Sequence, residues 1–269
     1  MYHNKTILIT GASSGLGRTL ALKYAQQGGK IIHISRNIPR INALQQQLEV
    51  INSQKHLSFS ADVSQYQSIQ KINQELQCKN IYPDVIIHNA AGNFLCPFSK
   101  LSENGWKRII DIVLHGSFNI YHIFGNTMIK QKKTGVFLNI STTYANTGSA
   151  LVIPSAVAKA GVDNLMRGLT VEWSSHDIRF VGIAPGPIQN SGGSSKLDPL
   201  RLFQFYNNYM NPRKRMATQD EIAELSLFLT SKKADYINGE IVRIDGGEVV
   251  QNSGEFNFLT RIPFYEKII

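Results

Sequence analysis

Short apolar runs alternate with longer amphipathic stretches along most of the chain. A short continuous apolar run between turn residues is typical of a buried strand, and a 3.6-residue apolar period is typical of a helix. The predicted strands are residues 6–10, 31–35, 57–61, 85–88, 135–140, 180–184 and 241–244. The predicted helices are residues 15–27, 39–52, 66–77, 106–130, 155–174 and 219–230.

Regular alternation of strands with helices predicts an α/β fold, because parallel strands need crossover helices between them. The pattern favours a single doubly wound Rossmann domain over residues 1–269, with a seven-stranded parallel sheet flanked by helices. No internal repeat or linker divides the chain. Residues 189–215 break the alternation and carry several Lys and Arg residues. A loop of this length is typical of a functional lid or of a poorly ordered segment. Because it follows the sixth strand at the carboxyl end, where α/β sheets bind ligands, we predict a substrate lid there.

Composition sets the class of protein. Hydrophobic residues make up 42% and charged residues 17% of the 269 residues, ordinary values for a soluble globular protein. No apolar run approaches the ~20 residues of a membrane span. The two cysteines, Cys78 and Cys96, exclude a disulfide framework, and no Cys/His cluster has zinc spacing. With no signal or transit peptide in view, we expect a cytoplasmic protein without a metal site or membrane association.

The net charge of +9 has two interpretations. One is a basic surface that serves solubility alone. The other is attraction to a polyanion: a phosphorylated cofactor, a coenzyme A ester or a nucleic acid. The chain has no basic run with interleaved aromatic residues, so we expect no nucleic-acid partner.

A glycine-rich turn lies between the first predicted strand and the first predicted helix. Glycine lets the backbone approach a pyrophosphate closely, and the helix N-terminus supplies N–H donors and positive potential. Because strand, turn and helix come in the required order, the turn predicts a dinucleotide site. The residues assigned to the cofactor in this turn are Gly11, Ser13, Ser14, Gly15, Leu16 and Gly17.

The second predicted strand ends in Ser35 and Arg36, without the acidic residue that accepts hydrogen bonds from a free ribose 2′-hydroxyl. Both side chains suit a 2′-phosphate and favour NADP(H), although a solvated arginine at a loop edge is the alternative. Asp62, followed by Val63, is expected at the adenine, with a helix cap as the alternative. The small residues after the fourth predicted strand are expected at the cofactor, or else form a tight turn: Asn89, Ala90, Ala91 and Gly92.

Several short motifs occur together with that turn. They are residues 89–92, Lys159, residues 185–188 and residues 245–247. Together they resemble the short-chain dehydrogenase/reductase family, from the first strand to near the C-terminus. The resemblance implies that Lys159 binds the nicotinamide ribose. It implies further cofactor contacts at Pro185, Gly186, Pro187 and Ile188.

One catalytic position departs from that family. Where the family has Tyr-x-x-x-Lys, this chain has Ser155 followed by Lys159, and an unexpected tyrosine, Tyr144, lies upstream. A serine is a far weaker acid and base than a tyrosine, which disfavours alcohol–ketone chemistry. Two hydroxyls on one oxygen instead stabilise an enolate-like charge, which suits reduction of a conjugated C=C bond. On the residues alone, a helix-capping Ser155 and an ordinary packed Tyr144 are the alternatives.

Further segments narrow the resemblance. Residues 89–94, 111–116, 141–148, 154–161 and 253–256 are similar to the mitochondrial type of 2,4-dienoyl-CoA reductases. That group also has a serine in the usual tyrosine slot, and Val113 and Thr142 replace the usual asparagine and serine. The resemblance implies NADPH-dependent reduction of an acyl-CoA thioester, 2,4-dienoyl-CoA, to 3-enoyl-CoA in fatty acid oxidation, by a homotetramer. The rival hypotheses are another carbonyl or enone reductase on this fold and an NADPH-binding protein without turnover.

The resemblance also implies residue roles. Tyr144 and Ser155 donate to the thioester carbonyl, Lys159 keeps positive potential near it, and Asn93 braces Tyr144. The implied substrate contacts are Phe94, Ser102, Tyr144, Ser155 and Lys196.

Three of these residues have plainer alternatives, and two basic contacts are changed. Asn93 could be a turn residue, Phe94 a core residue and Ser102 a helix N-cap. Lys196 stands where an arginine is expected, which keeps the charge but loses bidentate geometry. Ser64 stands where another basic contact to coenzyme A is expected, so that contact is lost or moved.

Overall fold

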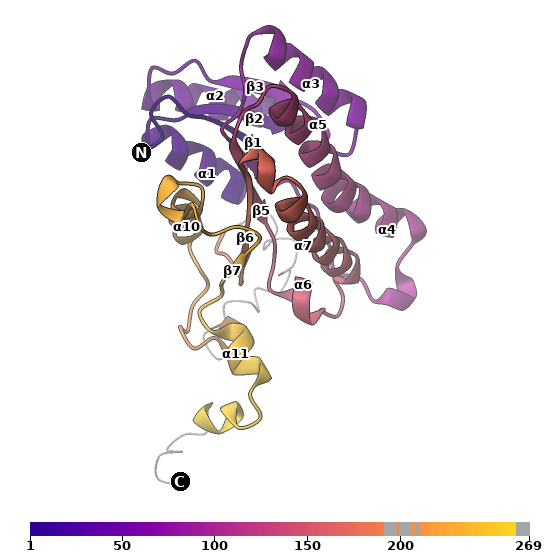
Figure 1. Cartoon of the computed structure of the whole chain (residues 1–269). Helices are drawn as coiled ribbons and strands as arrows, with labels where there is room; N and C mark the ends of the chain where they lie inside the picture. The colour runs from indigo at the N-terminus through magenta and orange to yellow at the C-terminus, as the bar shows by residue number, and fades with distance from the viewer. Residues whose placement is uncertain (191–197, 199–205, 208–209, 262–269) are drawn as a thin grey trace.

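The computed structural model describes residues 1–190, 198, 206–207 and 210–261. In this part of the chain, seven strands form a single sheet with the order β3-β2-β1-β4-β5-β6-β7 (Figure 1). The strands are β1 (Thr6–Thr10), β2 (Lys30–Ser35), β3 (Leu57–Ser60), β4 (Val85–His88), β5 (Gly135–Ile140), β6 (Ile178–Pro185) and β7 (Ile241–Ile244). All neighbouring strands are parallel, which confirms the predicted α/β fold with a seven-stranded parallel sheet.

Helices cover both faces of the sheet (Figure 1). One face carries α1 (Gly15–Gln26), α2 (Ile38–Ile51) and α10 (Gln219–Leu229). The other carries α3 (Tyr66–Cys78), α4 (Glu103–Ile110), α5 (Gly116–Lys130) and α7 (Ile153–Glu172). The short helices α6 (Tyr144–Thr147) and α11 (Glu248–Ser253) follow β5 and β7.

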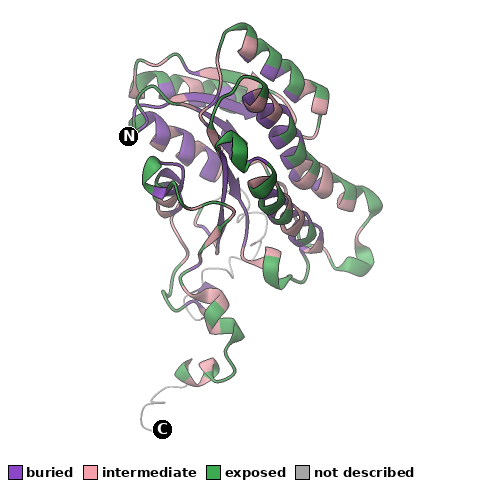
Figure 2. Ribbon diagram, in the orientation of Figure 1, coloured by how far each residue is buried: buried purple, intermediate pink, exposed green. Residues whose placement is uncertain are grey.

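The core is divided by the sheet into two apolar layers. Successive strand residues point to opposite faces, so Ile7 and Ile9 pack with α1 and α10 while Leu8 packs with α3 and α5. Figure 2 shows the strands buried in the centre and the outward sides of the helices exposed. Strands buried on both faces explain why the predicted runs are continuously apolar.

The helix predicted over residues 106–130 differs in the structure. It begins at Glu103, because Ser102 Oγ accepts a hydrogen bond from the Gly105 N–H at 3.1 Å and caps α4. A π-helical segment, Asp111–His115, then separates α4 from α5. Ser117 Oγ donates to the Val113 carbonyl within this region, a local bond that competes with the regular helical pattern. A change of helical type leaves no mark in the apolar period, so the pattern predicts one helix.

The helix predicted from residue 155 begins two residues earlier, at Ile153, with Pro154 in its first turn. The N-cap of α7 is Val152 and Ser155 lies inside the first turn, so the alternative in which Ser155 caps the helix is wrong. The proposed lid, residues 189–215, falls largely outside the described residues. Its borders are joined, since the Gln189 N–H donates to the Ala217 carbonyl at 2.9 Å.

Candidate active site

The glycine-rich turn joins β1 to α1 at the carboxyl edge of the sheet, beside the point where the strand order reverses. Gly11 has a φ of +65°, and a Cβ there would lie 2.9 Å from the Ala90 Cα. A Cβ on Gly17 would lie 2.4 Å from the Gly11 carbonyl oxygen. The close approach of turn, helix and β4 therefore requires both glycines. This packing holds the N-terminus of α1, whose N–H groups favour a phosphate, beside the turn.

The loop after β4 holds this turn in place. The side-chain amide of Asn89 donates to the carbonyl oxygens of Thr10 at 3.1 Å and Gly11 at 3.3 Å. The backbone N–H groups of Asn89 and Ala90 both donate to Thr10 Oγ1. Asn89 thus uses its amide to fix the backbone of the turn, which pre-organises the surface offered to a cofactor.

The ends of β2 and β3 meet at the predicted 2′-phosphate contacts. Ser35 Oγ accepts from the Ser13 N–H at 3.0 Å, and Arg36 Nη1 lies 3.3 Å from Asp62 Oδ2. The other Asp62 oxygen accepts from the Ser64 N–H and Oγ at 3.0 and 2.8 Å. Burial opposes ionisation, but the Ser64 hydrogen bonds and Arg36 outweigh it and hold the pKa of Asp62 below its ordinary value. Arg36 is therefore ion-paired rather than freely solvated.

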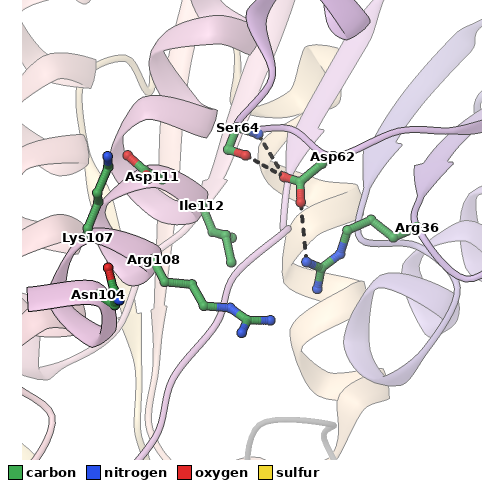
Figure 3. Close-up of a pocket in the computed structure, with 8 residues that line it drawn as sticks. All are labelled: Arg36, Asp62, Ser64, Asn104, Lys107, Arg108, Asp111 and Ile112. Atoms are coloured by element: carbon green, nitrogen blue, oxygen red, sulfur yellow. Dashed lines mark hydrogen bonds and ion pairs between the residues drawn. The ribbon is translucent and has the colours of Figure 1, made fainter. Parts of the chain in front are cut away.

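An open pocket of about 330 Å³ lies at this end of the sheet (Figure 3). Its walls come from the ends of β2 and β3 on one side and from α4 and the π-helical segment on the other. The lining residues are Arg36, Asp62, Ser64, Asn104, Lys107, Arg108, Asp111 and Ile112.

Three polar side chains predicted at the reaction centre come together. Asn93 Nδ2 donates to the Tyr144 hydroxyl at 3.1 Å, and the Tyr144 hydroxyl lies 3.3 Å from Ser155 Oγ. They come from the loop after β4, the first residue of α6 and the first turn of α7. Ser155 is only 3% exposed, whereas Tyr144 is half-buried. Two hydroxyl groups therefore meet beside the end of the sheet, the arrangement expected for donation to one oxygen.

Lys159 lies one turn further along α7 and is buried. Its Nζ donates to the Ile140 carbonyl oxygen, the last residue of β5. Burial lowers the pKa of Lys159 to about 8, with the nearby charge of Asp163 acting in the opposite direction. The ammonium group of Lys159 therefore loses its charge as the pH rises through about 8, only slightly above neutral.

Asp163 was missed by sequence reasoning. It is 2% exposed and accepts hydrogen bonds from Asn139 Nδ2 at 3.0 Å and Ser141 Oγ at 2.6 Å. Burial raises the pKa of Asp163, and the Ser141 hydrogen bond and the charge of Lys159 partly offset that increase. Its signal was a carboxylate four residues after Lys159, on the helix face that carries Ser155 and Lys159.

Comparison with known proteins places the chain in a family. A family model described as enoyl-(acyl carrier protein) reductase matches residues 11–248. The crystal structure of a short chain dehydrogenase from Bacillus anthracis is 36% identical, with a TM-score of 0.84 over 91% of this chain and 96% of that one. The chain belongs to the short-chain dehydrogenase/reductase family.

Two curated relatives carry a more specific name. A Bacillus subtilis protein named probable 2,4-dienoyl-CoA reductase, (2E)-enoyl-CoA-producing, is 40% identical over 91% of this chain and 96% of its own length. The rat peroxisomal 2,4-dienoyl-CoA reductase, (3E)-enoyl-CoA-producing, is 32% identical over 92% of this chain and 84% of its own. The predicted resemblance to the dienoyl-CoA reductases is confirmed.

In this member of the family, the surroundings of Lys159 differ from the usual pattern. Val113, where the family has an asparagine, is fully buried among apolar side chains.

His88, the last residue of β4, is also buried, and its Nδ1 lies 3.2 Å from Thr10 Oγ1. Burial and then the charge of Lys159 lower the pKa of His88 to about 3. A neutral His88 cannot serve as a proton donor near neutral pH.

The other residues predicted to contact the substrate or the cofactor have the following places in the structure. Ser102 caps α4, as its alternative stated. Phe94 is half-buried against the apolar layer of α4 and α5, which fits a core residue. A Cβ on Gly186 would lie 3.0 Å from the Asp245 Cα, so the loop after β6 packs tightly on the segment after β7. Lys196 lies outside the described residues.

The described residues hold neither a metal-binding cluster nor a membrane-spanning helix. Residues 1–190, 198, 206–207 and 210–261 contain no group of three or more His, Cys, Asp or Glu side chains placed to hold a metal ion. Among the same residues, no helix has the length and apolar character needed to span a membrane.

Proposed function

We propose that this protein reduces 2,4-dienoyl-CoA thioesters to 3-enoyl-CoA with NADPH, in the oxidation of unsaturated fatty acids. The observation that carries the proposal is the hydrogen-bonded series Asn93–Tyr144–Ser155, which offers two hydroxyl groups where the family has one tyrosine. The names of the Bacillus subtilis and rat relatives support the substrate class.

The carboxyl edge of the sheet fits a dinucleotide with a 2′-phosphate. The N-terminus of α1 offers N–H donors and positive potential to a pyrophosphate, and Arg36 provides a cation at the end of β2. In the proposed complex, Ser35 and Arg36 hold the 2′-phosphate and Lys159 binds the nicotinamide ribose. When bound, NADPH supplies the hydride for the reduction.

The residues of the chain act on the thioester oxygen. As the δ-carbon is reduced, negative charge delocalises through the conjugated system to this oxygen, where the Tyr144 and Ser155 hydroxyls donate to it. Asn93 holds the hydroxyl oxygen of Tyr144 in place for that donation. Lys159, protonated below its pKa of about 8, keeps positive potential beneath the same oxygen. These contacts strengthen as charge develops, so they lower the barrier more than they tighten substrate binding.

Protonation of the delocalised anion decides the product. A proton on the α-carbon gives 3-enoyl-CoA, and a proton on the γ-carbon gives 2-enoyl-CoA. The rat and Bacillus subtilis relatives are named for different products. We propose protonation by water at the α-carbon.

A substrate panel tests the proposal. Oxidation of NADPH with 2,4-hexadienoyl-CoA, but not with acetoacetyl-CoA or free enones, is the expected result. In D₂O the product should carry deuterium at the α-carbon beside a 3,4 double bond, as measured by NMR. Turnover of acetoacetyl-CoA alone would instead assign a carbonyl reductase, and deuterium at the γ-carbon would overturn the 3-enoyl assignment.

We also propose a homotetramer, on the resemblance to this group of reductases. Phe118 on α5 and Val157 on α7 are 45% and 46% exposed, apolar positions that a neighbouring subunit would cover. Light scattering during size-exclusion chromatography tests this, with four times the 30.1 kDa chain mass expected.

A further inference from the structure

Arg108 extends into the pocket of Figure 3 from the wall opposite Arg36. It belongs to α4, whereas Arg36 follows β2, so the two residues come from opposite sides of the pocket. Both guanidinium groups point into the same open space in Figure 3. Lys107, the neighbouring cation, points away from Arg36.

The two arginines differ in their partners. Arg36 uses one nitrogen to contact Asp62 at 3.3 Å, and 58% of its side chain is exposed. The side chain of Arg108 makes no hydrogen bond or ion pair with any residue in the described part of the chain. An arginine presents five N–H donors in a planar fork that matches a phosphate. Arg108 therefore has its full donor set available inside a pocket that already holds a second guanidinium.

The charges around the pocket indicate the kind of ligand. Asp62 is ionised beside Arg36 and would repel a phosphate bound by Arg36 alone. A second cation on the other wall offsets that repulsion. Ile112 adds an apolar surface beside Arg108, and Asp62 and Asn104 add polar groups. Two cations and an apolar patch in one pocket suit a phosphorylated ribose attached to a flat base.

We propose that Arg36 and Arg108 together bind a phosphomonoester at the 2′ or 3′ position of the ribose of an adenine nucleotide. The inference rests on the proposed function, because both of its nucleotides carry such a group. NADPH has a 2′-phosphate, and coenzyme A has a 3′-phosphate. The two share their chemistry, and the position of the phosphate distinguishes them.

Calorimetric titration of small nucleotides tests the assignment. The probes are 2′,5′-ADP, 3′,5′-ADP and 5′-AMP, bound to the full chain and to Arg108→Ala. We expect Arg108→Ala to weaken at least one of the two bisphosphates about 10-fold and 5′-AMP less than twofold, as for loss of one exposed charge-assisted contact. Loss for 2′,5′-ADP assigns the phosphate to NADPH, and loss for 3′,5′-ADP assigns it to coenzyme A.

Matched variants separate charge from position. Lys232→Ala removes an exposed positive charge that does not line the pocket and should leave all three affinities within twofold. Arg108→Lys should recover part of the affinity, because it restores the charge without the fork. Unchanged binding to Arg108→Ala would overturn the inference, and so would equal loss for all three nucleotides. Melting temperatures show whether each variant folds.

The titrations need no turnover, so the two proposals can fail separately. If NADPH oxidation with 2,4-hexadienoyl-CoA is seen but Arg108→Ala binds both bisphosphates normally, only the assignment of Arg108 is wrong. If neither bisphosphate binds the wild-type chain better than 5′-AMP, the phosphate site itself is wrong.

Discussion

The direction of the hydrogen bond from Asn93 to Tyr144 follows from the loop that holds Asn93. The Phe94 N–H donates to Asn93 Oδ1 at 2.9 Å, so the amide nitrogen of Asn93 must face Tyr144. Tyr144 accepts that hydrogen bond and keeps its own proton to donate. Ser155 lies close enough to share the same acceptor. The backbone N–H of Phe94 thus fixes which atom of the Asn93 amide faces the Tyr144 hydroxyl.

Replacing Tyr144 with Phe keeps the ring and removes the donor. We expect kcat to fall by roughly 100- to 1,000-fold, the usual cost of losing one donor to a developing oxyanion. The Kd for NADPH should stay the same, since the hydroxyl is not assigned to the cofactor. Tyr66→Phe, which removes an exposed hydroxyl bonded to His122, is the control. Near-normal kcat in Tyr144→Phe would show that the ring only packs.

The charge of Lys159 predicts a pH dependence. Its pKa is lowered to about 8, so it is protonated below that pH and neutral above it. If the positive charge assists catalysis, kcat/KM should fall as pH rises through about 8. Asp163 favours the charged form, so Asp163→Asn should lower the pKa of Lys159 and move this fall to lower pH. A profile in Asp163→Asn that keeps its alkaline limb in place would contradict the coupling.

At the scale of elements, β5 and the residue that follows it contact two buried charged groups of α7, Lys159 and Asp163. The side chains of Asn139 and Ser141 hold Asp163, and the carbonyl between them, on Ile140, accepts from Lys159. The position of α7 on the sheet therefore sets the geometry of the proposed site. That position depends on close packing between α5 and the C-terminal end of α7.

Gly125 on α5 is where that packing is tightest. A Cβ there would lie 2.0 Å from the buried Trp173 ring. Gly125→Ala should therefore destabilise the protein by about 1–3 kcal/mol through overpacking, despite the better helix propensity of alanine. Gly168→Ala, on exposed α7 surface with no atom within 4 Å, should stabilise by up to about 1 kcal/mol. Urea unfolding of both variants measures the difference, and equal free energies of unfolding would refute the packing argument.

At the scale of the whole molecule, the net charge of +9 acts on any anionic substrate. Both proposed ligands carry several phosphates, so attraction to the basic surface should raise their encounter rate and affinity. The effect depends on salt, because exposed charges are screened beyond about 10 Å at 0.1 M ionic strength.

The KM for 2,4-hexadienoyl-CoA should therefore rise with added salt, while the KM for a hexadienoyl-pantetheine thioester, which lacks the nucleotide, should change little. Lys196→Glu should raise the KM for the coenzyme A ester further, and most at low salt. Initial rates across a salt series measure both effects. A Lys196→Glu enzyme with an unchanged KM at every salt concentration would place the coenzyme A contact elsewhere.

The sequence by itself determined the strand and helix alternation, the glycine-rich turn and the paired motif of Ser155 and Lys159. These are local properties, since apolar period, turn chemistry and residue spacing are all set by neighbours along the chain. They were sufficient for the resemblance to the family, and the resemblance in turn implied that Asn93, Tyr144 and Ser155 meet.

Only the tertiary structure decided the partners of these residues. The burial that brings the pKa of Lys159 to about 8 and the support of Asp163 by β5 join residues far apart in the chain. The π-helical segment that ends α4 likewise leaves no apolar period to detect. Arg108 becomes a candidate phosphate contact only because folding places it across a pocket from Arg36. Burial and electrostatic coupling act through space, so they become visible only when the sheet is assembled.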